Sequence, residues 1–424
     1  MELINQYGSI LVIITAFLGF LMAFGIGAND VSNAMGTSVG SGTITVKQAI
    51  LIAMVFELAG AYLAGGEVAD TIKSGIIQPD AFTGRPDIMV LGMMSSLCAS
   101  GVWLVIATKM GWPVSGTHTI IGAVIGFACI TIGTDAIQWG QLGGIVGSWF
   151  ITPVIAGIIA YLIFINSQKL IFNRSNPLEQ AKKFGPLYMG MTIFIIAIVT
   201  IAKGLKHVGL HLTNFETFII SLGLALIAVT FGYFYFRSQA FLAKMKANDD
   251  GKGFIGVEKI FSILMLLTAC AMAFAHGSND VANAIGPLAA VQAIVASGGV
   301  IQEKAALAPW ILPLGGVGMI VGLAVMGRAV MATVGTGITE LTPSRGFAAQ
   351  FACAVTVVIA SGTGLPISTT QTLVGAILGV GFARGIAALN LGIIRNIIAS
   401  WVVTLPAGAI LSIIFYYILS AFFH

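Results

Sequence analysis

One thirteen-residue segment occurs twice in this chain and constrains its fold more than any other feature. Residues 24–36 read FGIGANDVSNAMG and residues 274–286 read FAHGSNDVANAIG, with eight of thirteen positions identical at an offset of 250 and no gap. Each copy follows an apolar run, where a carboxylate costs about 2.5–3.5 kcal/mol at the centre of a membrane-spanning helix. Asp30 and Asp280 therefore stand at matched places in two halves and predict one site to which both halves contribute.

The composition is that of an integral membrane protein. Of the 424 residues, 57% are hydrophobic and only 8% are charged, whereas a soluble domain has about 25% charged residues. The lipid bilayer is therefore the solvent for most of the chain. The formal net charge of +4 says little about partners. For a chain of this class we expect no nucleic-acid partner.

Twelve apolar runs are long enough, or nearly so, to cross a bilayer. Each should be helical, because lipid offers no partner to an unpaired backbone group. The runs are residues 8–28, 46–66, 88–108, 113–130, 140–165, 187–203, 215–236, 258–275, 305–327, 345–360, 366–383 and 392–420. If all twelve cross and the N-terminus is outside, fifteen of the twenty Lys and Arg residues face the cytoplasm. The sequence thus predicts an all-α protein of the cytoplasmic (inner) membrane with both termini outside.

A second repeated segment sets the limits of the two halves. Residues 111–126 and 364–379 agree at eight of sixteen positions with an offset of 253. This predicts repeat units at 1–165 and 257–424, with five runs each, and a connection at 166–256 with two spans and basic cytoplasmic loops. Seven runs separate the two unit starts, and an odd number inverts the second unit, as in secondary transporters. The inversion depends on whether 113–130 and 366–383 cross or re-enter, which the sequence leaves open.

The repeated Asn-Asp-x-x-Asn pattern offers oxygen ligands for a cation. Asn29 and Asn33 lie one helical turn apart on the same face. Gly27 and Gly36 flank the pattern and let the helix break there, which would expose carbonyl oxygens as in transporter ion sites. The candidate Na⁺ ligands are Asn29, Asp30, Asn33, Asn279, Asp280 and Asn283. The alternative is that the buried acids only fix helix packing through neighbouring amides.

The second repeated segment predicts an anion site instead. Pro113 and Pro366 are each followed by Ser or Thr just ahead of an apolar run, the pattern of a helix start. A helix N-terminus carries free N–H groups and about half a positive charge, so two facing ends would hold an oxyanion without Lys or Arg. The alternative is that the hydroxyls only cap two helices. The candidate residues are Ser115, Gly116, Thr117, His118, Ser368, Thr369, Thr370 and Gln371.

Two further polar residues remain without a settled role. His118 stands beside the first cap, with Gln371 at the matching place, and is either a hydrogen-bonded structural residue or a proton relay. Glu57 lies in the middle of an apolar run and has no acidic counterpart in the second half. An intramembrane acid of this kind predicts an ion ligand or a proton carrier involved in coupling.

The sequence gives no reason to predict an enzyme. It contains no Walker-type glycine loop, no HExxH and no Cys/His cluster. We therefore expect no cofactor, and the ion to be bound is a co-transported one.

Taken together, these residues resemble the inorganic phosphate transporter (PiT) family, whose hallmark is a duplicated G-x-N-D-x-x-N-A segment. Here it reads GANDVSNA at 27–34 and GSNDVANA at 277–284, and the segments after Pro113 and Pro366 resemble the family's P-x-S-x-T pattern. The resemblance implies twelve membrane segments in inverted repeats, both ends outside, and cation-coupled uptake of inorganic phosphate. It also implies that the Asp and Asn residues of both copies hold cations and that the capping Ser and Thr residues hold the anion.

Three functions follow from the residues and this resemblance. The first is a secondary active transporter that imports phosphate by symport with Na⁺. The second is an H⁺-coupled carrier of phosphate or sulfate in which Glu57 and His118 form the relay. The third, from another class, is a passive anion channel. Stoichiometry, the protonation state of the phosphate, homo-oligomer formation, and rocking versus elevator motion remain open.

Overall fold

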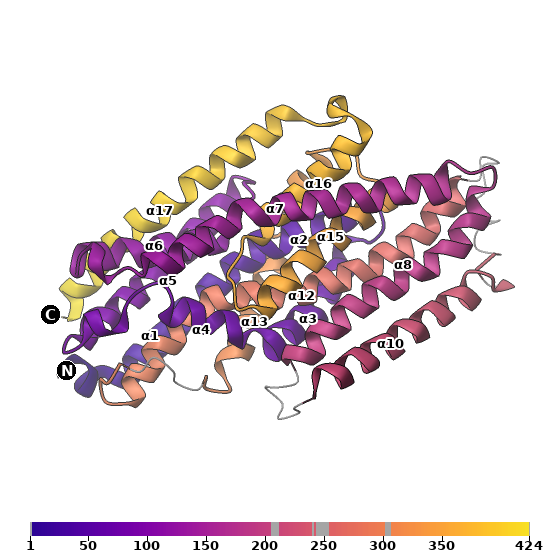
Figure 1. The fold of residues 1–424 in the computed structure, drawn as a ribbon. Helices are drawn as coiled ribbons and strands as arrows, with labels where there is room; N and C mark the ends of the chain where they lie inside the picture. Colours follow the sequence, from indigo (N-terminus) through magenta and orange to yellow (C-terminus); the bar gives the residue numbers. More distant parts are fainter. Residues whose placement is uncertain (1, 205–211, 240, 243–253, 302–306, 424) are drawn as a thin grey trace.

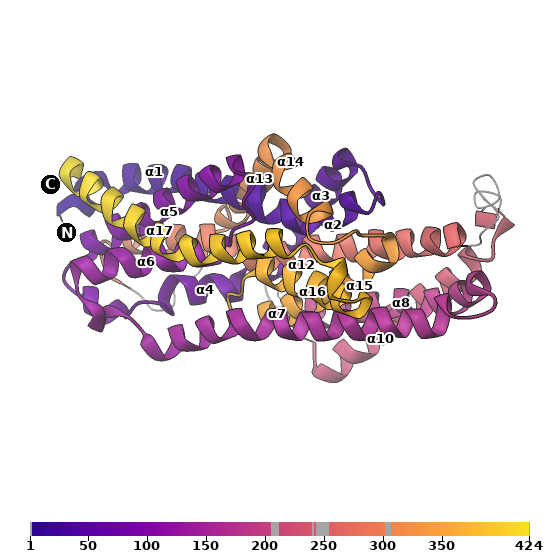
Figure 2. The same ribbon diagram turned by 90° about the horizontal axis from the view of Figure 1, so that it is seen from above.

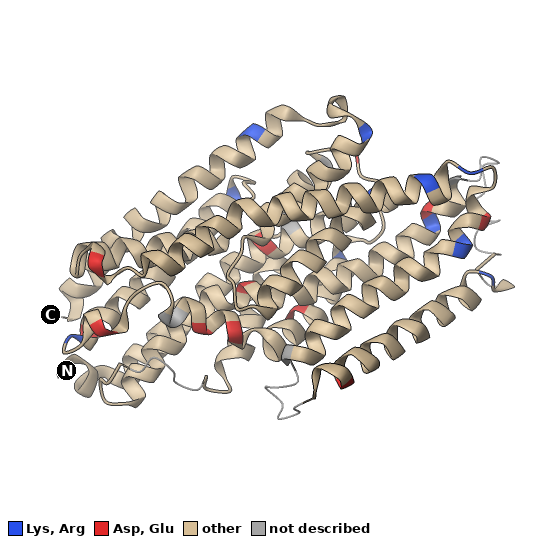
Figure 3. Cartoon of the chain, viewed as in Figure 1, with Lys and Arg blue, Asp and Glu red and all other residues tan. Residues whose placement is uncertain are grey.

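The protein is an elongated bundle of helices. The computed structural model describes residues 2–204, 212–239, 241–242, 254–301 and 307–423. Within these ranges the regular structure is helical, apart from one isolated bridge between Ile77 and Ile137. Both termini lie at the same end of the bundle in two perpendicular views (Figures 1 and 2). Most Lys and Arg residues lie toward the opposite end (Figure 3).

The division into two units and a connection stays a prediction, and the helices fall into its three ranges as follows. The first unit contains α1 (Glu2–Ile26), a π-helical turn (Gly27–Val31), α2 (Ser32–Gly40), α3 (Val46–Ala64), α4 (Gly66–Ser74), α5 (Pro86–Lys109), α6 (Gly116–Thr131) and α7 (Trp139–Ser167). The connection contains α8 (Pro177–Val199) and α10 (Asn214–Tyr235). The second unit contains α12 (Phe254–Ala296), α13 (Ile311–Met326), α14 (Arg328–Thr336), α15 (Pro343–Gly362), α16 (Thr369–Arg384) and α17 (Leu391–Phe423). The short helices α4 and α14 lie outside the predicted runs.

Every predicted run coincides with a helix, but fewer than twelve helices qualify as spans. Nine in the described part of the chain are long and apolar enough, or ten if α13 and α14, bent by 78°, count as one. The helices α6 and α16 have 16 residues each. At about 1.5 Å per residue they are shorter than a hydrocarbon core of about 30 Å. The number of twelve crossings therefore stays a prediction.

The backbone around the first Asn-Asp pattern is distorted but stays helical. A π-helical turn spans Gly27–Val31 and α2 follows it directly, so the expected break with exposed carbonyls is wrong here. The glycines instead allow helices to approach closely. Gly27 faces the backbone of Met319, and Gly277 faces the backbone of Glu57, where an added Cβ would collide with a carbonyl oxygen. The second pattern lies inside the continuous helix α12.

Helices of one unit pack mainly against helices of the other. The short helix α6 lies along α17, and the short helix α16 lies along α7. In the same way, α3 packs on α12 and α1 packs on α13. The helices α1 and α12 run antiparallel, because Gly8 lies against Val295 and Gly19 lies against Leu288. Because α6 and α16 each pack on a long helix of the other unit, their N-termini lie in the middle of the bundle.

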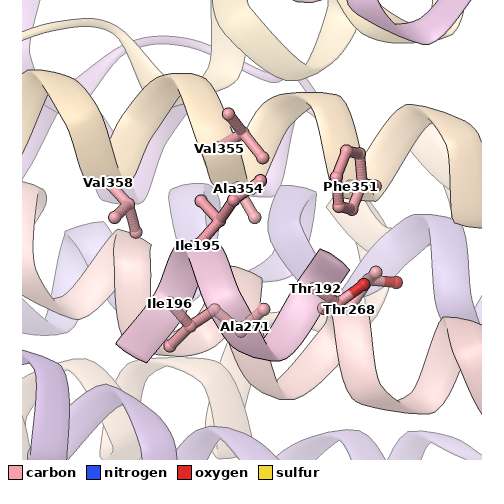
Figure 4. A pocket seen from close by; sticks show the side chains of 9 residues that line it. All are labelled: Thr192, Ile195, Ile196, Thr268, Ala271, Phe351, Ala354, Val355 and Val358. Atoms are coloured by element: carbon pink, nitrogen blue, oxygen red, sulfur yellow. The ribbon is translucent and has the colours of Figure 1, made fainter. Parts of the chain in front are cut away.

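The connection helix α8 packs beside this arrangement. Between α8, α12 and α15 there is a small cavity of about 10 Å³, about the space of one water molecule. Thr192 and Thr268 line it together with apolar side chains (Figure 4). Their hydroxyls donate to the carbonyls of Tyr188 and Met265. The cavity thus has no polar group in need of a ligand, and the functional candidates lie elsewhere.

Candidate functional site

Both predicted helix starts are confirmed. Ser115 caps α6 by accepting a hydrogen bond from the backbone N–H of His118 at 3.2 Å. Ser368 caps α16 by accepting one from the backbone N–H of Gln371, also at 3.2 Å. A cap of this type leaves further N–H groups of the first turn available to an anion. Both helix ends are buried.

The two helix ends also touch each other. The hydroxyl of Thr117 donates to the carbonyl of Ile367 at 2.9 Å. The hydroxyl of Thr370 donates to the carbonyl of Val114 at 3.0 Å. Both the donors and the acceptors differ by 253 positions, the offset of the repeated segment. The predicted juxtaposition of the two helix starts is therefore present in the structure.

Asp30 lies where the two ends meet. Its Oδ2 atom accepts a hydrogen bond from the backbone N–H of Gly116 at 3.1 Å, and its Oδ1 atom lies 2.8 Å from the hydroxyl of Thr370, whose single hydrogen is shared between Asp30 and the carbonyl of Val114. The residue is only 1% exposed. One carboxylate thus binds donors from both α6 and α16.

Asp280 has a different environment. Its Oδ2 atom accepts a hydrogen bond from the hydroxyl of Thr369 at 2.6 Å and lies 2.9 Å from Nε2 of His276. The other ring nitrogen of His276 lies 3.0 Å from Oε2 of Glu57. A neutral imidazole has only one N–H. One N–H therefore suffices for the hydrogen bond with Glu57, and Nε2 lies at ion-pair distance from Asp280 without a hydrogen bond of its own.

His276 was not among the residues singled out from the sequence. It is four positions before Asp280 inside an apolar segment, which places both side chains on one helical face. That spacing was the available signal. The predicted relay had paired Glu57 with His118, but Glu57 pairs with His276 instead. His118 stacks on the ring of Trp149, with 3.8 Å between the ring centroids.

The amides next to the two acids are fixed by equivalent contacts. Asn29 donates to the hydroxyl of Thr108 at 3.1 Å and to the carbonyl of Trp112 at 2.9 Å. Asn279 donates to the hydroxyl of Ser361 at 3.1 Å and to the carbonyl of Leu365 at 3.2 Å. The acceptors again differ by 253 positions. With both N–H donors engaged, each amide oxygen is left as an acceptor.

The third amide position is described in the second half alone. Asn283 donates to the hydroxyl of Thr117 at 3.1 Å, which joins α12 to the start of α6. The side chain of Asn33, its counterpart, lies outside the described residues. The counterpart of Glu57 can be identified from the helix packing. Gly277 packs on the backbone of Glu57, and the equivalent Gly27 packs on the backbone of Met319. A methionine therefore occupies in the second half the place that Glu57 has in the first.

The arrangement brings two kinds of chemistry into one buried space. Carboxylate and amide oxygens are hard ligands of the kind that bind Na⁺ and similar cations. The capped ends of α6 and α16 supply N–H and O–H donors suited to an anion. The oxygen ligands lie on helices long and apolar enough to span a membrane, and the anion donors lie at the starts of the shorter helices α6 and α16. All of these side chains except that of Asn33 are described and buried. Such a fold and site define a multi-pass membrane transport protein.

The chain belongs to the phosphate transporter family. The sequence model of that family matches residues 26–412, which includes both repeated segments. A candidate phosphate permease of Haemophilus influenzae is 70% identical over the full length of both chains. The chloroplastic inorganic phosphate transporter 2-1 of Arabidopsis thaliana is 40% identical over 95% of this chain and 71% of its own length.

A solved structure supports the same assignment. The structure titled as the sodium-dependent phosphate transporter matches with a TM-score of 0.89 and 39% sequence identity. The match covers 97% of this chain and 99% of that chain. The fold of the described bundle is therefore that of a known transporter.

Proposed function

We propose that this protein imports inorganic phosphate across the cytoplasmic membrane by symport with Na⁺. The proposal is supported by family membership and by the sodium-dependent transporter of the same fold. The observation that carries it is the position of Asp30, whose carboxylate meets donors from both α6 and α16. A cation ligand and the two anion-binding helix ends are thus in direct contact.

The coupling follows from this contact. Na⁺ binds the oxygens of Asp30, Asp280 and the neighbouring amides, and phosphate binds the ends of α6 and α16. Because opposite charges lie side by side, each ligand raises the affinity for the other, and by linkage the two effects are equal. Phosphate is preferred to sulfate because it keeps at least one proton at neutral pH and can donate it to a carboxylate.

Inverted repeats are part of the proposal. They are supported by the antiparallel course of α1 and α12 and by contacts that recur at the sequence offsets of 250 and 253. Termini on the outside are supported by the gathering of Lys and Arg at the other end of the bundle (Figure 3). The hairpins α5–α6 and α15–α16 then enter from opposite sides, and their tips meet at the site.

Radiolabelled phosphate uptake into proteoliposomes tests the function. With an inward Na⁺ gradient, phosphate should accumulate above its outside concentration, and replacing Na⁺ by choline at fixed pH should stop the accumulation. Uptake that continues under a proton gradient without Na⁺ would instead favour the H⁺-coupled carrier, for which the contact of Glu57 with His276 is the supporting observation. Equilibration without accumulation would indicate a channel.

A further inference from the structure

The two halves of the cation site are unequal in a way that sets an order of binding. We propose that the first cation enters the second half, at Asp280 and Asn283, and that Asp30 leaves the ends of α6 and α16 only afterwards, which opens them to the anion. This order rests on the proposed symport and assigns a separate step to each half.

In the first half, the oxygens of the motif that the structure describes already have donors. Asn29 Oδ1 accepts a hydrogen bond from the backbone N–H of Val114 at 3.1 Å. Both carboxylate oxygens of Asp30 accept as well, from Gly116 and Thr370. A cation that binds here must first break some of these hydrogen bonds.

In the second half, three oxygens of the motif are buried without donors, although Oδ2 of Asp280 accepts from Thr369. Within the described residues, the Oδ1 atoms of Asn279, Asp280 and Asn283 have less than 1 Å² of exposed surface each and no hydrogen-bond partner. A buried polar atom without a partner costs about 1–3 kcal/mol and is rare. Asp280 and Asn283 lie at i and i+3 on one face of α12. Their two oxygens are therefore ready to bind a cation without any bond being broken.

The charges around the two acids agree with this order. Asp280 is not the only acid at this place, because the carboxyl group of Glu57 contacts the same His276 ring. Around Asp30, the equivalent places are taken by Ile26 and Met319, and the charge is that of one carboxylate. Two acids therefore lie beside the proposed cation position of the second half, and one acid lies beside that of the first half.

The order has a consequence for the anion. While Asp30 accepts hydrogen bonds from Gly116 and Thr370, its carboxylate occupies donors that would otherwise bind phosphate, and two anions repel each other at this distance. A cation at Asp280 reduces the negative charge of the site, and a second cation then draws Asp30 away from the helix ends. Phosphate therefore binds after the second cation has displaced Asp30 from the helix ends.

Binding of ²²Na⁺ to the purified full-length protein, measured without phosphate, tests the order. Asp280→Asn and Asp30→Asn are a matched pair, since each makes the same change at the same position of its half. We expect Asp280→Asn to weaken the binding of the first Na⁺ at least about tenfold, the loss of a charged ligand, and Asp30→Asn to weaken it by a clearly smaller factor. Asn283→Ala, which keeps every charge, should also weaken it, and thermal unfolding of each variant verifies its fold.

The results separate the order from the symport itself. Equal loss of Na⁺ binding in Asp30→Asn and Asp280→Asn, or loss in Asp30→Asn alone, overturns the order and leaves Na⁺ symport intact. A wild-type protein that binds no Na⁺ overturns both the order and the Na⁺ coupling.

Discussion

The hydroxyl of Thr370 donates a hydrogen bond of 2.8 Å to the carboxylate of Asp30, although 340 positions separate the two residues in the chain. The contact joins the start of α16 in the second half to the distorted helix of the first half. A movement that separates α16 from this helix would therefore break the contact between the proposed cation ligand Asp30 and the proposed anion-binding end of α16. This is the physical link between the two proposed transport substrates.

Neutralising either acid should abolish coupled uptake. Asp30→Asn and Asp280→Asn keep the size of the side chain but remove the charge that attracts Na⁺, so we expect phosphate uptake to fall at least about tenfold. The measurement is Na⁺-driven uptake into proteoliposomes at equal amounts of inserted protein. Normal uptake by both variants would refute the assignment of the cation ligands.

Removing a capping hydroxyl should weaken phosphate binding in particular. Thr117→Val and Thr370→Val each delete a donor at a helix end, and hydrogen bonds to charged groups contribute about 1.5–3 kcal/mol. We expect the KM for phosphate to rise about tenfold or more, with a smaller change in the KM for Na⁺. Thr131→Val, at the other end of α6, is the control, because its hydroxyl donates to the carbonyl of Phe127 within the same helix. A larger effect on Na⁺ than on phosphate would contradict the anion site.

The stability of the protein should depend on how many hydrogen-bond donors the side chain at position 276 offers to the two acids. His276→Ala leaves two buried carboxylates without a shared donor, and breaking a buried pair costs about 3–5 kcal/mol. His276→Gln still offers one amide donor group, so the melting temperature should decrease in the order wild type, Gln, Ala. Ile26 is the equivalent residue of the first half, and Ile26→Ala is the control. This variant creates a cavity, but it should still take up phosphate at temperatures below its unfolding. A His276→Ala protein with wild-type stability would exclude the bridging role.

Close helix packing at the motif glycines should not tolerate a methyl group. Gly27→Ala and Gly277→Ala would press a Cβ into the backbones of Met319 and Glu57, and overpacking costs about 1–3 kcal/mol. We expect a lower melting temperature in detergent for both. Gly223→Ala in α10 is the control, since no atom lies within 4 Å of its added Cβ and alanine favours the helix. Equal melting temperatures in all three variants would show that the two glycines are not packing positions.

The orientation in the membrane is accessible to cysteine labelling. Thr83→Cys and Ser175→Cys, made in a protein without the native cysteines, place exposed thiols before α5 and after α7. With both termini outside, an impermeant maleimide should label Thr83→Cys in intact cells and Ser175→Cys only after permeabilisation. The reverse pattern would invert the assignment of sides.

The sequence predicts the helices and the starts of α6 and α16 well, because both depend on the local order of apolar, proline and hydroxyl residues. The apolar runs give the helices, and the positions of Pro113 and Pro366 give the starts of α6 and α16. The repeats also predict that the two helix starts face each other, and the contacts of Thr117 and Thr370 across them agree with this. Duplication carries this information because equivalent residues find equivalent partners.

What the sequence does not reveal depends on partners from distant segments. The role of Glu57 follows only from His276, which is 219 positions away. The effect of Gly27 depends on the backbone of Met319 across a helix contact, so close packing could not be distinguished from a broken helix. The two halves differ in which motif oxygens accept hydrogen bonds. This depends on backbone donors such as the N–H of Val114, whose position the sequence motif does not specify.

The central claim is that one buried site, built from both halves, holds Na⁺ and phosphate in contact with each other. The most direct measurement is the affinity of the purified protein for phosphate over a series of Na⁺ concentrations, with choline keeping the ionic strength constant. The Kd for phosphate should fall steadily as Na⁺ rises, and Na⁺ affinity should increase by the same factor with phosphate. A phosphate Kd that does not change with Na⁺ would contradict the claim.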